Sequence, residues 1–568
     1  MRVVPAVIRR AVASNKLFAI ALGLAVLLRL DAELGYRWQS WFNDSWKYVD
    51  TAITLNLDPT RPSGYGLYLW LLKPFHSFAL VTVSQHLMGL LVAVMIYALA
   101  KHRFGAPEWV GVLAALPVLY DGFEIELEHL IMADTLFLFL AMLAITVLLW
   151  SPLRGGGSPW WRSPWLRCAV AGGLLGLSAI VRSTGLPLIP VFAVYLLVWF
   201  VGSRVGWRTL TASITAFVAA GLLPVAGYAG WFDIQHGTFN TSTSTGVFLY
   251  SRVMTFADCS RMRLTPELLS LCTTVPPDRR PIAQAYIWTS ASPLARFPAP
   301  LFSPLPNSLG KQFAIKAIEA QPLDYARVVF DDTWRSFGWN RSVFPNAATY
   351  SEYLFGYDSV TISSGHPVPG YPSSAAAYLR GGDPRTEVVN PFAAAIRLYQ
   401  RYVWLPGTVY GLILLVGLAG MIFAWRRGGG EAVLPWACSL ALIVIPAATA
   451  QFDYRYVLTA TPFACLAAAL AFGRDTAGRR WLARGRRPAT ATSAAPTPVG
   501  PIPAGPPPTS DVSGSPGIGL VSGAPGAPGA PAAPGGPARL PSRLPDDGLG
   551  GGPAEAGHDQ RDFTPDTS

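Results

Sequence analysis

The stretch KLFAIALGLAVLLRL, residues 16 to 30, decides the class of this fold. It is a nearly uninterrupted apolar run of the kind that forms a membrane-spanning helix. Basic residues lie before the stretch at Arg9 and Arg10 and at its start at Lys16, which would also suit a secretory signal. No small-x-small cleavage site follows, however, and many further apolar runs do, so we interpret the stretch as an uncleaved first span. Its basic flank predicts that the N-terminus lies in the cytoplasm.

The composition of the whole chain agrees with a membrane protein. Its 568 residues are 51% hydrophobic and 14% charged, whereas soluble proteins average about 25% charged residues. The 19 tryptophans and 21 tyrosines suit the lipid–water interfaces. The formal net charge of +11 raises the alternative of a nucleic-acid partner. Because Arg and Lys fall in short clusters between apolar runs, and no nucleic-acid-binding motif is visible, we interpret this charge as setting the topology.

Apolar runs separated by polar loops predict about ten transmembrane helices. Every cluster of Arg and Lys, such as KHR at residues 101 to 103, then falls on the cytoplasmic side. The sequence therefore predicts an all-α polytopic protein of the plasma membrane with both termini in the cytoplasm. The predicted spans cover about residues 17–30, a run ending near 100, 108–120, 131–150, the two runs that flank RSTG at 182–185, a run ending near 231, and 404–423, 433–450 and 456–472.

The spans divide the chain into four predicted parts. Residues 232–403 contain no clear span and are numerous enough for a globular extracytoplasmic domain between spans seven and eight. The end of the chain is basic and then rich in Pro, Ala and Gly, so we expect a disordered cytoplasmic tail that acts as a spacer rather than as a tether for a partner. The parts are the transmembrane catalytic module 1–231 with its first outside loop 31–65, the extracytoplasmic domain 232–403, the spans 404–473 and the tail 474–568.

The five cysteines fall into two groups. Cys259 and Cys272 lie in the predicted extracytoplasmic domain, where the compartment is oxidising, and we expect them to form a disulfide. Cys168, Cys438 and Cys465 lie in or at the ends of spans, where a free cysteine packs as a small apolar residue. No spacing of Cys and His resembles a zinc site, so the sequence predicts neither a metal nor a cofactor.

Acids, bases and a tyrosine gather at the predicted outer ends of the spans. Two of them, Arg182 and Arg455, lie beside or within apolar helices on the side that the positive-inside rule disfavours. A charge in such a place is costly, so a functional partner is the first hypothesis, and pairing with a neighbouring acid is the alternative. The candidate site residues are Asp44, Tyr48, Asp50, Lys73, His76, Glu128, Asp134, Arg182 and Arg455.

The stretch FNDSWKYVDTAITL, residues 42 to 55, places two aspartates in the first outside loop. If a helix begins at Ser45, Asp44 stands at its N-cap and Tyr48 lies over it at the i+4 spacing. Asp50 is then turned about 120° away, so the two carboxylates are not an equivalent pair. We expect one of them to do chemistry, with plain capping as the alternative for Asp44. Capping is also the alternative for Asp134, which lies near the start of an apolar helix.

Four motifs together resemble the GT-C class of membrane glycosyltransferases. They are DSWKY from residue 44, SGYGLYLWLLKPF from residue 63, EHLIMADTLFLFL from residue 128 and YRYVLTATPF from residue 454. Their order and topology are similar to the lipid-carrier-dependent family that includes protein mannosyltransferases and the aminoarabinose transferase of lipid A. The extracytoplasmic stretch shows no such pattern.

The resemblance implies transfer of a sugar from a polyprenyl-phosphate donor to an extracytoplasmic protein, lipid or glycan, with inversion of the anomeric centre. Asp44, or Asp50 in its place, would accept the proton of the acceptor hydroxyl, and partial burial would raise the pKa of Asp44 toward a useful value. Cations would stabilise the charge of the lipid phosphate. The implied roles are phosphate binding for Lys73, Arg182 and Arg455, and sugar or acceptor binding for Tyr48, His76, Glu128 and Asp134.

Two alternatives belong to other classes of protein. A transporter typically carries internal repeats and charges near the middle of the bilayer, whereas this chain shows no repeat and places its charges at one surface. A scaffold or sensor of cell-envelope glycans would share the topology but would not need Asp44, Arg182 and Arg455 together.

Overall fold

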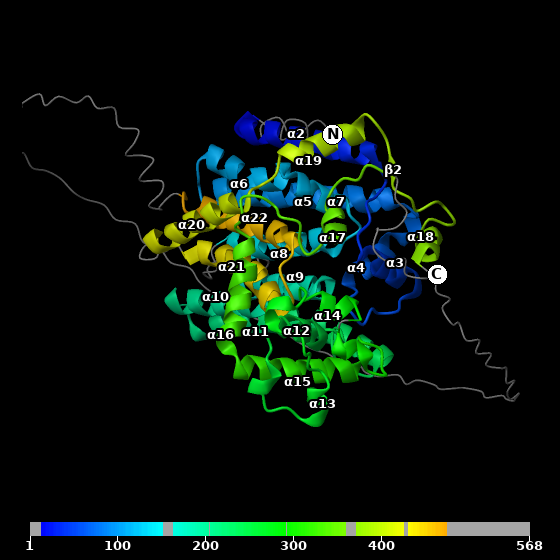
Figure 1. The fold of residues 1–568 in the computed structure, drawn as a ribbon. Coiled ribbons are helices and arrows are strands. Elements are labelled where there is room, and N and C mark those ends of the chain that lie inside the picture. Colours follow the sequence, from blue (N-terminus) through cyan, green and yellow to red (C-terminus); the bar gives the residue numbers. More distant parts are fainter. Residues whose placement is uncertain are drawn as a thin grey trace, which may run out of the picture. The chain divides into compact units, whose positions relative to one another are not determined.

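A computed structural model describes residues 13–151, 163–203, 205–290, 292–358, 371–424 and 430–473 (Figure 1). These residues belong to one compact unit, Met1–Thr490. The tail that the sequence predicts to be disordered, residues 474–568, lies outside the described residues.

Helices form in the N-terminal part wherever the sequence predicts a span. In lipid a helix satisfies its backbone polar groups internally, so a long apolar run has few alternatives. The first of these helices continues beyond the predicted end of its span, to Gly35. The helices are α2 (Lys16–Gly35), α3 (Ser45–Thr54), α4 (Gly64–Leu72), α5 (Phe78–Ala98), α6 (Glu108–Tyr120), α7 (Gly122–His129), α8 (Ala133–Leu149), α9 (Pro164–Val181), α10 (Leu188–Gly202) and α11 (Trp207–His236).

The middle of the chain forms shorter helices around a core of its own. Tyr250 and Phe313 are fully buried in that core, and Cys259 and Cys272 form a disulfide beside it. The helices are α12 (Thr245–Val253), α13 (Pro266–Leu269), α14 (Ala285–Trp288), α15 (Pro304–Ala320), α16 (Pro322–Arg335), α17 (Ala347–Ser351), α18 (Tyr371–Tyr378) and α19 (Phe392–Tyr402).

The last part of this middle stretch returns to the N-terminal helices. Helix α18 packs against α3, and α19 packs along α2 (Figure 1). The strand β1 (Tyr36–Arg37) pairs in antiparallel fashion with β2 (Glu387–Val388). The first outside loop is therefore held by segments that follow it more than 300 positions later in the chain.

Three helices complete the chain, namely α20 (Gly407–Ala424), α21 (Val433–Thr449) and α22 (Tyr454–Leu470). Among the described residues, five helices are long and apolar enough to cross a membrane, or six if α19 and α20, which bend by 59°, form one broken span. Helices α6 and α8 are apolar but shorter. The chain is thus a multi-pass membrane protein with a mostly helical fold, and the count of ten spans stays a prediction.

Helix α22 lies at the centre of the fold. It is buried along nearly all of its length and contacts α5, α6, α8, α20 and α21. Many of its residues are small, which lets neighbouring helices approach closely. Because α22 is packed on several sides, the residues at its first turn, Arg455 and Tyr456, are held in a fixed place.

Helices α9 and α11 approach closely at two glycines of α9. A Cβ atom on Gly172 would collide with the backbone carbonyl of Phe217, and one on Gly176 with that of Gly221. Gly173 differs, since a Cβ atom there would lie 3.9 Å from the nearest backbone oxygen of α11. Small residues one helical turn apart are a typical means of close packing between membrane helices.

We predict that Gly176→Ala lowers the free energy of unfolding by about 1–3 kcal/mol, because the added methyl group overpacks a contact between two backbones. Gly173→Ala is the matched control and should change stability by less than about 0.5 kcal/mol. Thermal unfolding of both purified variants in detergent measures the difference. Equal shifts in the two variants would contradict the packing described here.

Candidate active site

Asp44 occupies the N-cap position of α3, but its side chain forms ion pairs and does not cap the helix. Within the described part of the chain it makes no capping hydrogen bond, and Ser45 Oγ instead accepts a hydrogen bond of 2.9 Å from the backbone N–H of Phe42. The Asp44 carboxylate forms ion pairs with Arg61 and with Arg455, the latter at 3.0 Å. Its side chain is 16% exposed, so it lies close to solvent. Plain capping therefore does not explain Asp44.

Arg455 contacts two acids at the first turn of α22. Its guanidinium lies 3.0 Å from Asp44 and 3.2 Å from Asp453, and it lies 5.3 Å from the ring centroid of Phe42. Asp453 is fixed in turn, because it caps α22 and accepts a hydrogen bond of 2.6 Å from the Tyr353 hydroxyl. Arg455 thus joins the first outside loop to the central helix.

Arg182 forms a second ion pair nearby, with Asp134 in the first turn of α8. Its guanidinium lies 5.1 Å from the ring centroid of Tyr456, and that of Arg455 lies 5.7 Å from the same ring. Both arginines therefore have acids as partners, which is the alternative raised by the sequence. We call the six charged residues that meet here the Asp44 cluster, namely Asp44, Arg61, Asp134, Arg182, Asp453 and Arg455.

Sequence reasoning missed Arg61. It pairs with Asp44, and its guanidinium lies 6.0 Å from the ring centroid of Tyr48. The available signal was its position, because it is an arginine in an outside loop, two residues before the motif that begins at Ser63. The predicted neighbour of Asp44, Tyr48, does lie beside this pair and is buried.

The electrostatics of Asp44 differ from the expectation. Burial alone would raise the pKa of its carboxyl group, but the guanidinium groups of Arg61 and Arg455 outweigh that effect and hold the pKa below its usual range. The expectation that partial burial raises this pKa is therefore wrong for the protein without substrate. Nothing in the sequence indicated a second arginine at this carboxylate.

Three other predicted residues do not join the cluster. Asp50 accepts a hydrogen bond of 2.9 Å from Ser374 Oγ of α18, so it is turned away from Asp44 as expected. His76 has a left-handed backbone, and its Nδ1 lies 2.8 Å from the Tyr378 carbonyl oxygen. Lys73 forms no ion pair with any described residue.

Glu128 is placed differently from its predicted role. Both of its carboxylate oxygens lie 2.7 Å from nitrogens of Arg29, and one lies 2.8 Å from Nδ1 of His86. The Glu128 side chain is fully buried and that of Arg29 is 3% exposed. The prediction that Glu128 binds a sugar or an acceptor is therefore wrong, because its oxygens are already satisfied inside the protein. Arg29 could have been recognised as a residue that needs a partner, because it is an arginine within the first apolar run.

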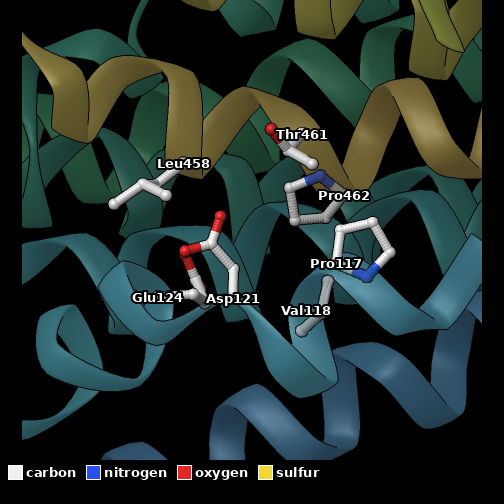
Figure 2. A pocket seen from close by; sticks show the side chains of 7 residues that line it. All are labelled: Pro117, Val118, Asp121, Glu124, Leu458, Thr461 and Pro462. Carbon is white, nitrogen blue, oxygen red and sulfur yellow. The ribbon is translucent and has the colours of Figure 1, made fainter. Parts of the chain in front are cut away.

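Two cavities border the central helix. The first, shown in Figure 2, lies between α22 and the ends of α6 and α7, beside Asp121 and Glu124, and measures about 10 Å³, which suits a single water molecule. The second is an apolar groove of about 530 Å³ between α6, α20 and α22. Its lining includes Trp109, Leu113, Leu412, Val416, Ala469 and Phe472. We call it the α6–α22 groove.

Comparisons with known proteins gave matches among solved structures alone. No protein-family model and no curated protein match the chain. The oligosaccharyltransferase of Archaeoglobus fulgidus, in a complex with Zn and sulfate, is 14% identical with a TM-score of 0.38, and the match covers 79% of this chain and 48% of that one. The same enzyme, AglB, in complex with an inhibitory peptide and a dolichol-phosphate is 14% identical with a TM-score of 0.37, over 84% of this chain and 52% of that one.

ArnT from Cupriavidus metallidurans bound to undecaprenyl phosphate is 14% identical with a TM-score of 0.32, over 81% of this chain and 78% of that one. The chain spans about half the length of the oligosaccharyltransferase structures that it matches. Because all of these TM-scores lie below 0.5, the function proposed below rests on this chain's own residues.

We predict that Glu128→Gln lowers the free energy of unfolding by about 3–5 kcal/mol, because it leaves the buried charge of Arg29 without a counter-charge. Glu319→Gln is the control, since Glu319 pairs with Lys316 on the surface, where an ion pair contributes about 1 kcal/mol or less. Thermal unfolding in detergent compares the two. If both variants unfold like the unchanged protein, the Arg29–Glu128 pair does not hold the fold together.

Proposed function

We propose that the protein is a glycosyltransferase that moves a sugar from a polyprenyl-phosphate donor to an extracytoplasmic hydroxyl group, with inversion at the anomeric carbon. The observation that carries this proposal is the carboxylate of Asp44 held between Arg61 and Arg455, with Arg182 beside the same Tyr456 ring as Arg455. The reaction needs a group that accepts a proton and cations that stabilise a phosphate leaving group. The Asp44 cluster supplies both kinds of group.

A phosphate ligand would have to exchange partners with the acids of the cluster. Three arginines face three aspartates, so a phosphate would have to compete for guanidinium groups that are already paired. Arginine is well suited to this exchange, because its planar fork binds a carboxylate or a phosphate with two parallel hydrogen bonds. The side chains of Asp44, Arg61 and Arg455 are 16–19% exposed, so a ligand can reach them.

The proposed step is a single displacement. The oxygen of the acceptor hydroxyl forms a bond to the anomeric carbon, and the bond from that carbon to the phosphate oxygen breaks with its electron pair going to the phosphate. Asp44 takes the proton of the acceptor hydroxyl. Arg455 and Arg61 stabilise the negative charge that develops on the polyprenyl phosphate. Attack from the face opposite the leaving group inverts the configuration.

Donor binding would also prepare the base. With both arginines beside it, Asp44 is a weak base, because their charges stabilise its ionised form. A phosphate that draws Arg61 or Arg455 toward itself removes part of that stabilisation and raises the pKa of Asp44. The carboxylate then becomes a useful proton acceptor in the complex with donor.

The α6–α22 groove supports a lipid-linked donor. Cys465, Ala469 and Phe472 of α22 line it, and Arg455 lies at the start of the same helix. A rise of 1.5 Å per residue puts about 15 Å along α22 between Arg455 and Cys465, the first residue of this helix that lines the groove. An isoprenoid chain whose phosphate lies at Arg455 would reach this apolar surface within a few of its units.

We predict that Asp44→Asn lowers the rate of transfer by about 10²–10⁴-fold, because the acceptor loses its general base. The assay measures transfer of radiolabelled sugar from polyprenyl-phosphate donors in membranes, at matched expression. Asp50→Asn is the control, since Asp50 lies on the same helix but contacts Ser374 of α18. Full activity in Asp44→Asn together with loss in Asp50→Asn would move the base to Asp50.

A second prediction concerns pH. The profile of kcat/KM reports the free protein, in which the pKa of Asp44 lies below its usual range, so its acid limb should fall below about pH 4. The profile of kcat reports the complex with donor, and its acid limb should lie at higher pH, because the phosphate has taken an arginine from Asp44.

Arg61→Gln removes one of the two cations and should raise the acid limb of the kcat/KM profile. Measurement of both profiles for the unchanged protein and for Arg61→Gln tests the coupling. Coincident acid limbs in kcat and kcat/KM would contradict it.

A further inference from the structure

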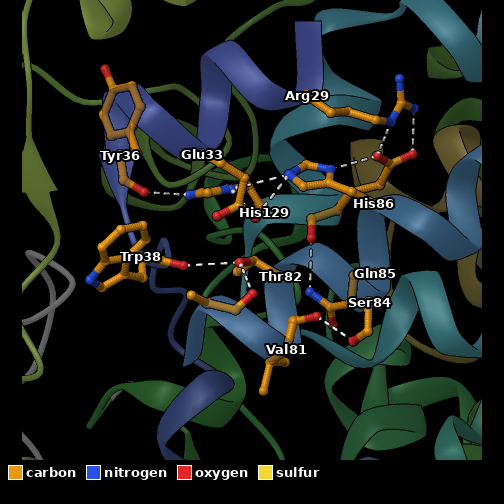
Figure 3. Close-up of polar contacts among 12 residues, drawn as sticks. Arg29, Glu33, Tyr36, Trp38, Val81, Thr82, Ser84, Gln85, His86 and His129 are labelled. Atoms are coloured by element: carbon orange, nitrogen blue, oxygen red, sulfur yellow. Dashed lines mark hydrogen bonds and ion pairs between the residues drawn. The ribbon is translucent and has the colours of Figure 1, made fainter. Parts of the chain in front are cut away.

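Three buried side chains from three different helices meet beneath the first outside loop. They are Glu33 of α2, His86 of α5 and His129 of α7 (Figure 3). His86 Nε2 lies 3.2 Å from His129 Nδ1, and Glu33 Oε1 lies 3.7 Å from His86 Nε2 and 3.9 Å from His129 Nδ1. None of the three residues is more than 8% exposed.

The outer hydrogen bonds of the two histidines fix their tautomers. His129 Nε2 lies 2.8 Å from the backbone carbonyl oxygen of Tyr36, which only accepts, so Nε2 carries the hydrogen. His86 Nδ1 lies 2.8 Å from Oε2 of Glu128, an oxygen that also accepts a hydrogen bond from Arg29, so Nδ1 donates and carries the hydrogen. In the neutral rings the other two nitrogens therefore present lone pairs to each other.

A third electron-rich atom faces the same point. Glu33 Oε1 is buried and has no hydrogen-bond partner among the described residues. Two imidazole lone pairs and a carboxylate oxygen so close together repel one another unless a cation lies between them. A buried, unpartnered oxygen carries a cost that such a cation would remove.

The distances suit a metal ion. The point equidistant from the three atoms lies about 2.1 Å from each, which is the bond length of Zn²⁺ to histidine nitrogen and carboxylate oxygen. We propose that Glu33, His86 and His129 bind one divalent transition-metal ion, with Zn²⁺ as the best fit. Imidazole ligands favour Zn²⁺ over Mg²⁺ or Ca²⁺, which prefer oxygen ligands alone.

The surroundings are those of a metal site. Histidine ligands usually donate their second N–H to a carboxylate or a backbone carbonyl, and here Glu128 and Tyr36 are those acceptors. Arg29 holds Glu128 in place. The ion would tie α2, α5 and α7 together below the loop that carries Asp44, and its burial gives it a structural role that does not depend on the proposed transfer reaction.

The test is the metal content of the full-length protein, purified in detergent through a tag without histidines. Inductively coupled plasma mass spectrometry should find about one Zn²⁺ per chain in the unchanged protein, and Glu33→Ala and His129→Asn should lose it. His76→Asn is the matched control, because His76 binds the Tyr378 carbonyl outside this group, and it should keep the metal.

A second measurement keeps the proposal testable if the variants fail to fold. X-ray absorption at the zinc edge of the unchanged protein should show two nitrogen ligands of histidine and at least one oxygen at about 2.0–2.1 Å. A chelator that removes the ion should lower the thermal unfolding temperature, and added Zn²⁺ should restore it. Folded protein that contains no metal and does not change its unfolding temperature with Zn²⁺ would overturn the proposal, and would mean that a shared proton joins the two histidines.

Discussion

A charge among apolar helices must have a partner, and this constraint organises the protein. Arg29 in the first apolar run pairs with Glu128, which lies 99 positions away. Arg455 pairs with Asp44 across 411 positions. Each pair joins segments that nothing local in the sequence would bring together, so the cost of an unpaired charge fixes where the loops sit on the helices.

Two groups of paired charges satisfy this constraint, and they differ in how far they are buried. The Arg29–Glu128 pair is closed, fully buried and backed by two histidines, so it suits a permanent joint. The Asp44 cluster is partly exposed, and within it Asp44 pairs with two arginines and Arg455 with two acids. Shared partners can be exchanged for a phosphate, whereas a closed pair cannot be opened without a large loss of stability. In the proposed function, burial therefore distinguishes the charged pair that stabilises the fold from the charged residues that bind the phosphate and accept the proton.

The sequence predicted much of the helical fold and part of the site. Each predicted span has a helix, because an apolar run in lipid has few other choices. Arg182 and Arg455 could be identified as candidates because they break the usual charge pattern, and Asp44 because it precedes a predicted helix in the first outside loop. Arg61 could not, since it reaches Asp44 only through the tertiary fold. Glu33, His86 and His129 follow no metal-binding spacing, as they come from three helices. The direction of the Asp44 pKa depended on those unseen neighbours.

The central claim is that a lipid phosphate and Asp44 compete for the same arginines. The most direct test is the affinity of the purified protein for radiolabelled polyprenyl phosphate, with Asp50→Asn as control. We expect Arg455→Gln to bind about tenfold more weakly, through the loss of a charged hydrogen bond, and Asp44→Asn to bind more tightly than the unchanged protein. If Asp44→Asn instead weakens binding as much as Arg455→Gln does, Asp44 holds the ligand rather than competing with it, and the account is wrong.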